Sequence, residues 1–132
     1  MYILIMKILV AEDDKDIAKA YQKILSAKGH EIICTYDGFE CLDIYKKGVA
    51  EKNSNYLPPF DLVIIDYSMP EMTGATLAKE IKSLNSKQRI IFATAHPDDL
   101  IDSIVPTSME IEILSKPFDY SSLMNILERQ IA

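Results

Sequence analysis

The sequence predicts an α/β fold in which one parallel sheet of five strands lies between two layers of helices. Apolar, β-branched runs alternate along the chain with segments of helical period, and three of the runs, KILVA, LVIID and RIIFAT, are almost continuously hydrophobic. This composition is typical of strands that are buried on both faces of a parallel sheet. Right-handed crossovers between such strands lead to a doubly wound sheet, a three-layer sandwich with five flanking helices.

The expected strands follow one another at intervals that leave room for a helix between them. They are residues 3–11, 31–35, 62–66, 90–94 and 111–114. Apolar residues recur every three or four positions in three other segments, residues 17–28, 77–84 and 123–131. Gly29 suits the end of the first of these helices. Residues 48–60 are polar and contain a Pro pair, and we expect their second half to be a loop that enters the third strand from its amino end.

Length and composition indicate a single globular domain. The 132 residues have a formal net charge of −6, and 48% of them are hydrophobic. The 14 Lys and Arg residues are scattered, so we expect no nucleic-acid partner. The apolar N-terminal run is too short to span a bilayer and lacks the features of a signal peptide, so we expect no membrane contact. The expectation is one domain over residues 1–132 without an output domain, a monomer or weak dimer.

The two cysteines, Cys34 and Cys41, bear on the cellular compartment. A chain with enough apolar residues to fold without cross-links and with only two cysteines is typically reduced, which favours a cytoplasmic protein. A Cys34–Cys41 disulfide is the alternative.

Polar residues follow every expected strand at its carboxyl end, where ligands bind in doubly wound sheets. These residues are Glu12, Asp13 and Asp14, then Asp37, Asp66, Thr94 and Lys116. Because the carboxyl ends of parallel strands meet at one edge of the sheet, we expect these side chains to form a site.

Each of these residues also has a structural interpretation. Asp66 could cap the turn in YSMPEMTG or the helix near Gly74, and Asp14 and Asp16 suit the N-cap and first turn of the first helix. A single strand-end threonine or lysine more often has no special role. Glu12 and Asp13 are poorly explained as helix caps because they come earlier, where the strand has just ended.

Together the strand-end residues suit one kind of chemistry. Glu12, Asp13 and Asp66 would form an oxygen-rich pocket for Mg²⁺ or Mn²⁺. With Lys116 and one divalent cation, three negative charges meet three positive charges, so the pocket is balanced only with the metal. A carboxylate nucleophile, a metal, the Thr94 hydroxyl and an ammonium are the groups that transfer a phosphoryl group to Asp66 as an acyl phosphate.

The sequence closely resembles the response regulator receiver domain of two-component signalling over essentially its whole length. The matching motifs are ILVAEDD, DLVIIDYSMPEMTG, IIFATAH and ILSKPF, in order and correctly spaced. The resemblance implies a flavodoxin-like sandwich with strand order 2-1-3-4-5.

The resemblance also implies a role for individual residues. Asp66 would be the phosphorylation site, Asp13 a direct metal ligand and Glu12 a ligand through water. Ser68 would offer its backbone carbonyl to the metal. Thr94 and Lys116 would be the switch residue and the phosphate-contacting residue, and Ala95 is small enough to leave room for the phosphoryl group.

The sequence departs from the family pattern at several positions. Ile113 stands where the family commonly has Tyr or Phe, which bears on the aromatic switch of activation but not on phosphorylation. Glu12 replaces a commoner Asp, and the connection from the second helix to the third strand is several residues longer than usual. Ser68 and His96 occupy variable positions that govern access of the hydrolytic water. His96 could instead be an exposed loop histidine that caps PDD.

The resemblance implies a phosphorylation-dependent switch that receives its phosphoryl group from a histidine kinase or a histidine phosphotransfer protein. Such a chain catalyses only its own phosphorylation and dephosphorylation, and passes the signal to a downstream protein whose identity the sequence does not specify. The main alternative, which Ile113 keeps open, is a constitutive protein-binding module. A dehalogenase-type phosphatase would need a second acid at Ser68, and a flavin binder would need a phosphate loop where Glu12 and Asp13 stand.

Overall fold

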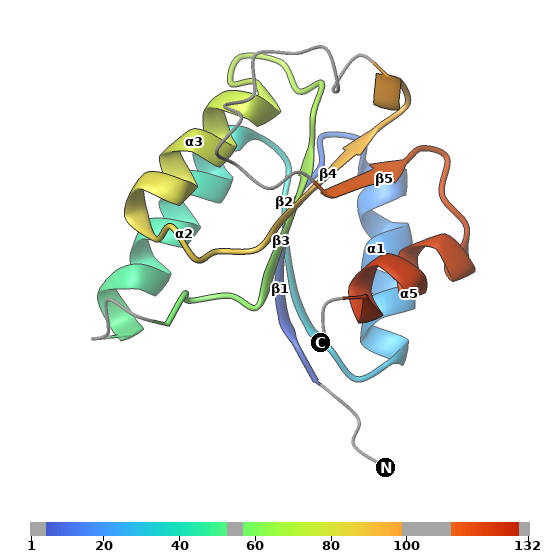
Figure 1. The fold of residues 1–132 in the computed structure, drawn as a ribbon, viewed down its shortest axis with the longest axis horizontal. Helices are drawn as coiled ribbons and strands as arrows, with labels where there is room; N and C mark the ends of the chain where they lie inside the picture. Colours follow the sequence, from blue (N-terminus) through green and yellow to red (C-terminus); the bar gives the residue numbers. More distant parts are fainter. Residues whose placement is uncertain (1–4, 53–56, 99–111, 130–132) are drawn as a thin grey trace.

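The computed structural model describes residues 5–52, 57–98 and 112–129, which form one twisted parallel sheet with helices on both faces (Figure 1). The strands are β1 (Lys7–Ala11), β2 (Glu31–Thr35), β3 (Leu62–Asp66), β4 (Ile90–Thr94) and β5 (Glu112–Ser115), in the order β2-β1-β3-β4-β5. The helices are α1 (Lys15–Ala27), α2 (Gly38–Lys52), α3 (Gly74–Leu84) and α5 (Tyr120–Glu128). The predicted fold class and strand order are confirmed.

Two details differ from the sequence prediction. Four of the five expected helices lie within the described residues. After β4 the backbone is helical at Pro97 and Asp98, and residues 99–111 lie outside the described residues. The first strand begins at Lys7; residues 3 and 4 of the expected strand lie outside the described residues, and Ile5 and Met6 are not part of it. Its expected partner, β2, begins only at Glu31, and the Met6 N–H donates to the imidazole Nδ1 of His30 instead of to a strand.

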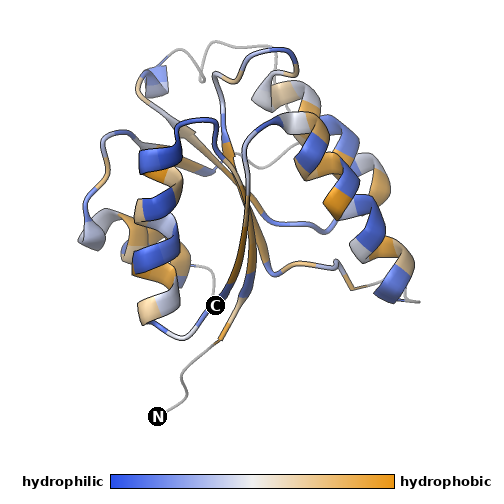
Figure 2. Ribbon diagram, turned by 180° about the vertical axis from the view of Figure 1, so that it is seen from behind, coloured by the Kyte–Doolittle hydropathy of each residue, from blue (hydrophilic) through white to orange (hydrophobic). Residues whose placement is uncertain are grey.

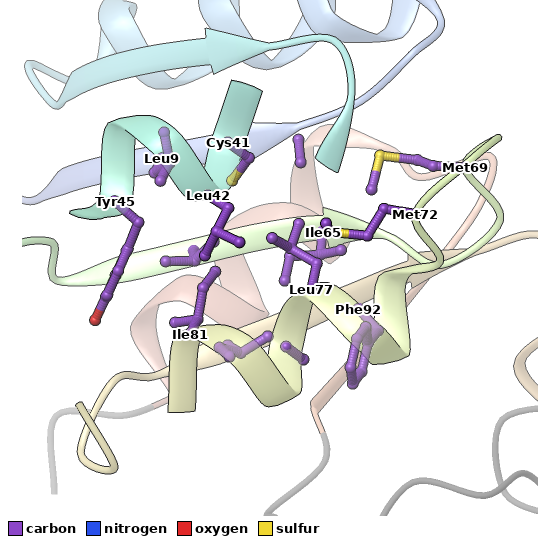
Figure 3. Packing of buried hydrophobic residues seen from close by; sticks show 14 of the residues in the cluster. Leu9, Cys41, Leu42, Tyr45, Ile65, Met69, Met72, Leu77, Ile81 and Phe92 are labelled. Carbon is purple, nitrogen blue, oxygen red and sulfur yellow. The ribbon is translucent and has the colours of Figure 1, made fainter. Parts of the chain in front are cut away.

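The sheet separates two apolar clusters, as expected for strands buried on both faces. β3 and β4 are buried at every position. On one face, α2 and α3 cover a cluster in which Leu42, Ile65 and Leu77 pack together (Figure 3). On the other face, α1 and α5 cover a second cluster around Tyr21 and Leu127. Figure 2 shows the consequence for the surface: the strands are hydrophobic, and the outer sides of the helices are hydrophilic.

The strand register aligns the carboxyl ends of the strands. Ala11 on β1 is level with Ile65 on β3, and Asp66 is level with Ala93 on β4. Thr94 in turn is level with Ser115 on β5. The residues that follow these positions therefore meet at one edge of the sheet.

Two further expectations concern cysteines and membranes. Cys34 and Cys41 are both free thiols, as predicted. Within the described ranges, no helix combines the length and the apolar character that a membrane span requires.

Candidate functional site

Three carboxylates from two neighbouring strand ends form the centre of the site. Glu12 and Asp13 follow β1, and Asp66 ends β3; one carboxylate oxygen from each lies within 4.8 Å of those of the other two. Glu12 is 1% exposed and Asp66 is 6% exposed, whereas Asp13 lies at the surface. The cluster that the strand-end pattern predicted is therefore present.

Glu12 is held in the site by three contacts. Its backbone N–H donates to the carbonyl of Thr35 at 3.0 Å, and its Oε2 accepts from the N–H of Asp14 at 3.1 Å. Its Oε1 lies 2.6 Å from Nζ of Lys116. Burial raises the pKa of Glu12 to about 7, against the opposing effect of the lysine. A neighbouring cation stabilises the ionised form of this buried carboxylate, and Lys116 supplies one.

Asp66 shares the same lysine. Its Oδ1 lies 3.4 Å from Nζ of Lys116 and accepts from the backbone N–H of Ser68 at 3.3 Å. Burial raises the pKa of Asp66, and the neighbouring Asp13 adds to the rise. Burial lowers the pKa of Lys116, but its contacts with the two buried carboxylates outweigh this effect, so the pKa is raised and the side chain stays an ammonium.

Thr94 and Lys116 are joined through their backbones. The N–H of Lys116 donates to the carbonyl of Thr94 at 2.7 Å. The Thr94 side chain is buried, and its hydroxyl accepts from the backbone N–H of His96 at 3.0 Å. The hydroxyl is the acceptor in this bond, so its own hydrogen takes no part in it. The Lys116–Pro117 peptide bond is cis.

The loop after Asp66 is fixed against α3 by a close backbone approach. The N–H of Gly74 donates to the carbonyl of Tyr67 at 3.1 Å, and that of Tyr67 donates to the carbonyl of Ala93 at 3.0 Å. A Cβ atom on Gly74 would lie 2.8 Å from Cα of Tyr67 and 2.9 Å from the carbonyl oxygen of Asp66. Only glycine allows this contact, so Gly74 holds the loop that contains Asp66 and Ser68.

Not every strand-end acid joins the site. Asp37 caps α2 instead, because its Oδ1 accepts from the N–H of Glu40 at 2.8 Å. Asp14 is the N-cap of α1, where it accepts from the N–H groups of Asp16 and Ile17. The predicted roles of Asp14 as N-cap and of Asp16 in the first turn of α1 are confirmed. Asp37 does not belong to the predicted site.

Thr35 was missed by the sequence analysis. It is fully buried, its hydroxyl donates to the carbonyl of Val10 at 2.7 Å, and its own carbonyl accepts from Glu12. These bonds lock the end of β1 to β2. The signal in the sequence was a hydroxyl residue that ends the second apolar run.

The donor set fits a divalent metal ion. Three carboxylates converge, two of them buried, and a single ammonium offsets their charge. Hard oxygen donors of this kind bind Mg²⁺ or Mn²⁺. Glu12, Asp13 and Asp66 are the residues that would hold the ion; the role of the Ser68 carbonyl stays a prediction.

Fold and site together define a class of protein: a flavodoxin-like sandwich with a carboxylate cluster, a threonine and a lysine at the carboxyl edge of its sheet. The sequence model of the response regulator receiver domain matches residues 8–128, and the chain belongs to this family. The family predicted from the four sequence motifs is confirmed.

The chain is similar in sequence or in structure to individual members of this family. The chain is 28% identical over 120 residues to the transcriptional regulatory protein DltR of Streptococcus agalactiae; the match covers 90% of this chain and 49% of DltR, so the chain spans about half the length of that relative. It is 28% identical to the response regulator receiver protein CpdR of Brucella abortus, with 95% of this chain and 96% of CpdR covered. The solved structure of the chemotaxis protein CheY4 of Vibrio cholerae matches with a TM-score of 0.77 and 25% identity, covering 96% and 98% of the two chains.

Proposed function

We propose that this chain is a phosphorylation-dependent signalling switch that accepts a phosphoryl group on Asp66 in a Mg²⁺-dependent reaction. The observation that supports it most directly is the contact of one lysine with two buried acids: Lys116 lies 2.6 Å from Glu12 and 3.4 Å from Asp66. The donor is a histidine kinase or a histidine phosphotransfer protein, which fits the family of the chain. The signal passes to a downstream protein in the cytoplasm.

The reaction transfers the phosphoryl group from a histidine nitrogen of the donor to a carboxylate oxygen of Asp66. A carboxylate oxygen of Asp66 forms a bond to phosphorus while the P–N bond of the donor phosphohistidine breaks, and the electron pair returns to the imidazole nitrogen. Asp66 must be ionised to attack, although burial raises its pKa. When bound, a divalent ion neutralises charge on the carboxylates and on the phosphoryl oxygens.

The residues around Asp66 stabilise the product. Lys116 is already within 3.4 Å of the acceptor and pairs with the new phosphoryl oxygens. The Thr94 hydroxyl, which accepts from His96, donates its hydrogen to one of them. We expect no turnover of an external substrate, because each event ends with the phosphoryl group on the chain itself or on water. Ser68 and His96, at the rim of the site, would tune the rate of that hydrolysis.

Labelling tests the proposal. Acetyl phosphate with Mg²⁺ should phosphorylate the wild type. We expect no phosphorylation of the wild type in the presence of a chelator, and none of the Asp66→Asn variant. Intact-mass spectrometry measures the product. A wild type that stays unlabelled, or an Asp66→Asn variant that is labelled equally, would refute the proposal.

A constitutive protein-binding module is the second candidate, and the packing of Ile113 favours it. Ile113 is level with Phe92 and packs against the cluster under α2 and α3. Ile113 offers no aromatic ring at the position where the family commonly has Tyr or Phe. Affinity for a downstream partner, measured with and without beryllofluoride as a phosphoryl mimic, separates the candidates: equal affinities favour the constitutive module.

A further inference from the structure

Two exposed aromatic side chains lie at the same edge of the sheet as the acids. The exposed large apolar side chains of the described residues are Ile5, Tyr36, Phe39, Leu57, Leu84 and Tyr120. The isoleucine and the two leucines come shortly before a strand, at the amino edge of the sheet. Tyr120 lies against Lys28, past the far end of α1. Among the described residues, Tyr36, directly after β2, and Phe39, in the first turn of α2, are thus the two at the carboxyl edge.

The strand register places Tyr36 level with the proposed phosphorylation site. Thr35, which precedes Tyr36, is level with Ala11 on β1. Ala11 is in turn level with Ile65 on β3, which precedes Asp66. β2 and β3 are two strand spacings apart, so the backbone of Tyr36 lies about 10 Å from that of Asp66.

A protein that delivers a phosphoryl group to Asp66 has to cover this neighbourhood. A specific protein–protein interface buries about 800 Å² of each partner, a patch roughly 15 Å in radius. An interface centred on Asp66 therefore includes Tyr36, and Phe39 lies one helical turn farther along the chain. Tyrosine and phenylalanine are enriched in such interfaces.

The turn that holds the two rings is fixed by its own contacts. The backbone N–H of Tyr36 donates to Oε1 of Glu40 at 2.8 Å, and that of Glu40 donates to Oδ1 of Asp37 at 2.8 Å. A Cβ atom on Gly38 would lie 2.9 Å from Cβ and Sδ of Met72, so the turn packs directly on the loop between β3 and α3. A surface that is already ordered loses less conformational entropy when a partner binds.

Lys15 adds a positive charge beside the rings. Its Nζ lies 5.8 Å from the centroid of the Tyr36 ring, and the side chain is exposed. Lys15 forms no ion pair with any of the described residues, although the chain has a formal net charge of −6. A partner that covers Tyr36 and Phe39 with apolar side chains can place a carboxylate against this ammonium.

We propose that Lys15, Tyr36 and Phe39 form a docking patch for the protein that carries the donor phosphohistidine. This inference rests on the proposed phosphorylation of Asp66. Apolar side chains of the donor protein cover the two rings, and one of its carboxylates faces Lys15. A small donor such as acetyl phosphate has no surface that could cover the patch, so phosphorylation by it does not use these three side chains.

Phosphotransfer from a protein and from a small molecule tests the assignment. The protein donor is the phosphorylated histidine kinase or phosphotransfer protein of the source organism that labels the wild type fastest. Tyr36→Ala/Phe39→Ala should lower kcat/KM for this donor by about tenfold or more, as truncation of interface aromatic residues does. The same variant should keep the wild-type rate with acetyl phosphate.

Leu84→Ala is the matched control. Leu84 is 39% exposed, close to the 44% of Tyr36, but it ends α3 at the opposite edge of the sheet. It should match the wild type with both donors. Lys15→Gln tests the charge: it should lower kcat/KM for the protein donor at low salt and have a smaller effect at high salt, where the interaction is screened.

The outcomes separate the patch from the proposed function. Equal kcat/KM values for Tyr36→Ala/Phe39→Ala and the wild type with the protein donor overturn the patch and leave the phosphorylation of Asp66 intact. An equal loss with both donors also overturns the patch, because the rings would then support the site rather than dock a partner. A wild type that acetyl phosphate labels but no donor protein does overturns the patch and the protein donor. A wild type that neither donor labels overturns the proposed function as well.

Discussion

The Nζ atom of Lys116, beyond the end of β5, lies 2.6 Å from Oε1 of Glu12, beyond the end of β1, although β3 and β4 separate these strands in the sheet. The lysine side chain is 14% exposed, and that of Glu12 is 1% exposed. The pair is thus largely removed from water, and each partner limits the desolvation cost of the other.

Removing the lysine should therefore destabilise the metal-free protein. In chelator at pH 8, Lys116→Met leaves Glu12 without its cation and should lower the free energy of unfolding by about 1–3 kcal/mol. In Glu12→Gln/Lys116→Met most of this loss should be recovered. Urea unfolding of the two single variants and the double variant gives the coupling energy, and additive effects would contradict a direct interaction.

Neutralising the acids should stabilise the protein without metal. Three carboxylates meet one ammonium, so Glu12→Gln/Asp13→Asn removes repulsion and should raise the melting temperature in chelator by about 2–6 °C. Mg²⁺ should stabilise the wild type but not this variant, because binding stabilises only a folded state that holds the ion.

Asp14→Asn is the matched control for this experiment. It removes a neighbouring charge but keeps a side chain that can cap α1, so the response to Mg²⁺ should remain. A lower melting temperature for the double variant than for the wild type in chelator would show that repulsion does not dominate in the pocket.

Gly74→Ala should impair both stability and phosphorylation. The added Cβ would meet backbone atoms of Asp66 and Tyr67 at 2.8–2.9 Å, and backbone cannot move aside as a flexible side chain can. We expect a loss of about 1–3 kcal/mol and slower labelling from acetyl phosphate. Gly29→Ala is the control: its φ of 88° makes alanine unfavourable, but nothing lies within 4 Å of the new atom and the residue is remote from Asp66. It should lose stability and keep its labelling rate.

His30 should make stability depend on pH in the acidic range. Burial lowers the pKa of His30 below its ordinary value of 6.5, and its Nδ1 accepts from the backbone N–H of Met6 at 3.0 Å. Protonation would place a hydrogen on that acceptor. The unfolded chain therefore binds more protons than the folded one, so this contribution is complete above pH 6.5 and is lost as the pH falls below it.

Melting curves between pH 5 and 8 measure this contribution. His30→Ala should be less stable at neutral pH and should show a smaller decline toward acid. A two-dimensional NMR titration of the imidazole gives the folded-state pKa directly; a value above 6.5 would contradict the prediction.

The fold was predictable because the central strands are almost continuous runs of apolar residues in the sequence. β3 and β4 are buried at every position and β1 at all but its first, so these three runs are almost free of polar residues. The site residues Glu12, Asp66, Thr94 and Lys116 could be found for the same reason. Each is the last residue of a strand or the first residue after one, and parallel strands bring their carboxyl ends to one edge.

The features that the sequence analysis missed have different causes: one is a local helix cap, and the others depend on contacts between distant residues. Asp37 follows a strand as Asp66 does, but Glu40 three residues later completes a helix cap and takes Asp37 out of the site. Tyr21 fits the apolar spacing of α1, but that spacing does not show what surrounds its hydroxyl group. Thr35 contributes a backbone carbonyl to Glu12, a role that any residue type could perform.

The level strand ends set where the chain can tolerate a change in length. Side chains alternate between the two faces of a strand, so one residue inserted within β1 or β3 would turn Glu12 or Asp66 away from its partners. The connection from α2 enters β3 from the opposite edge, where Asp61 bonds to Lys7 at the start of β1. Residues inserted in this connection would not change the positions of Glu12 and Asp66. The connection that the family resemblance predicts to be longer than usual ends at this edge, away from the acids.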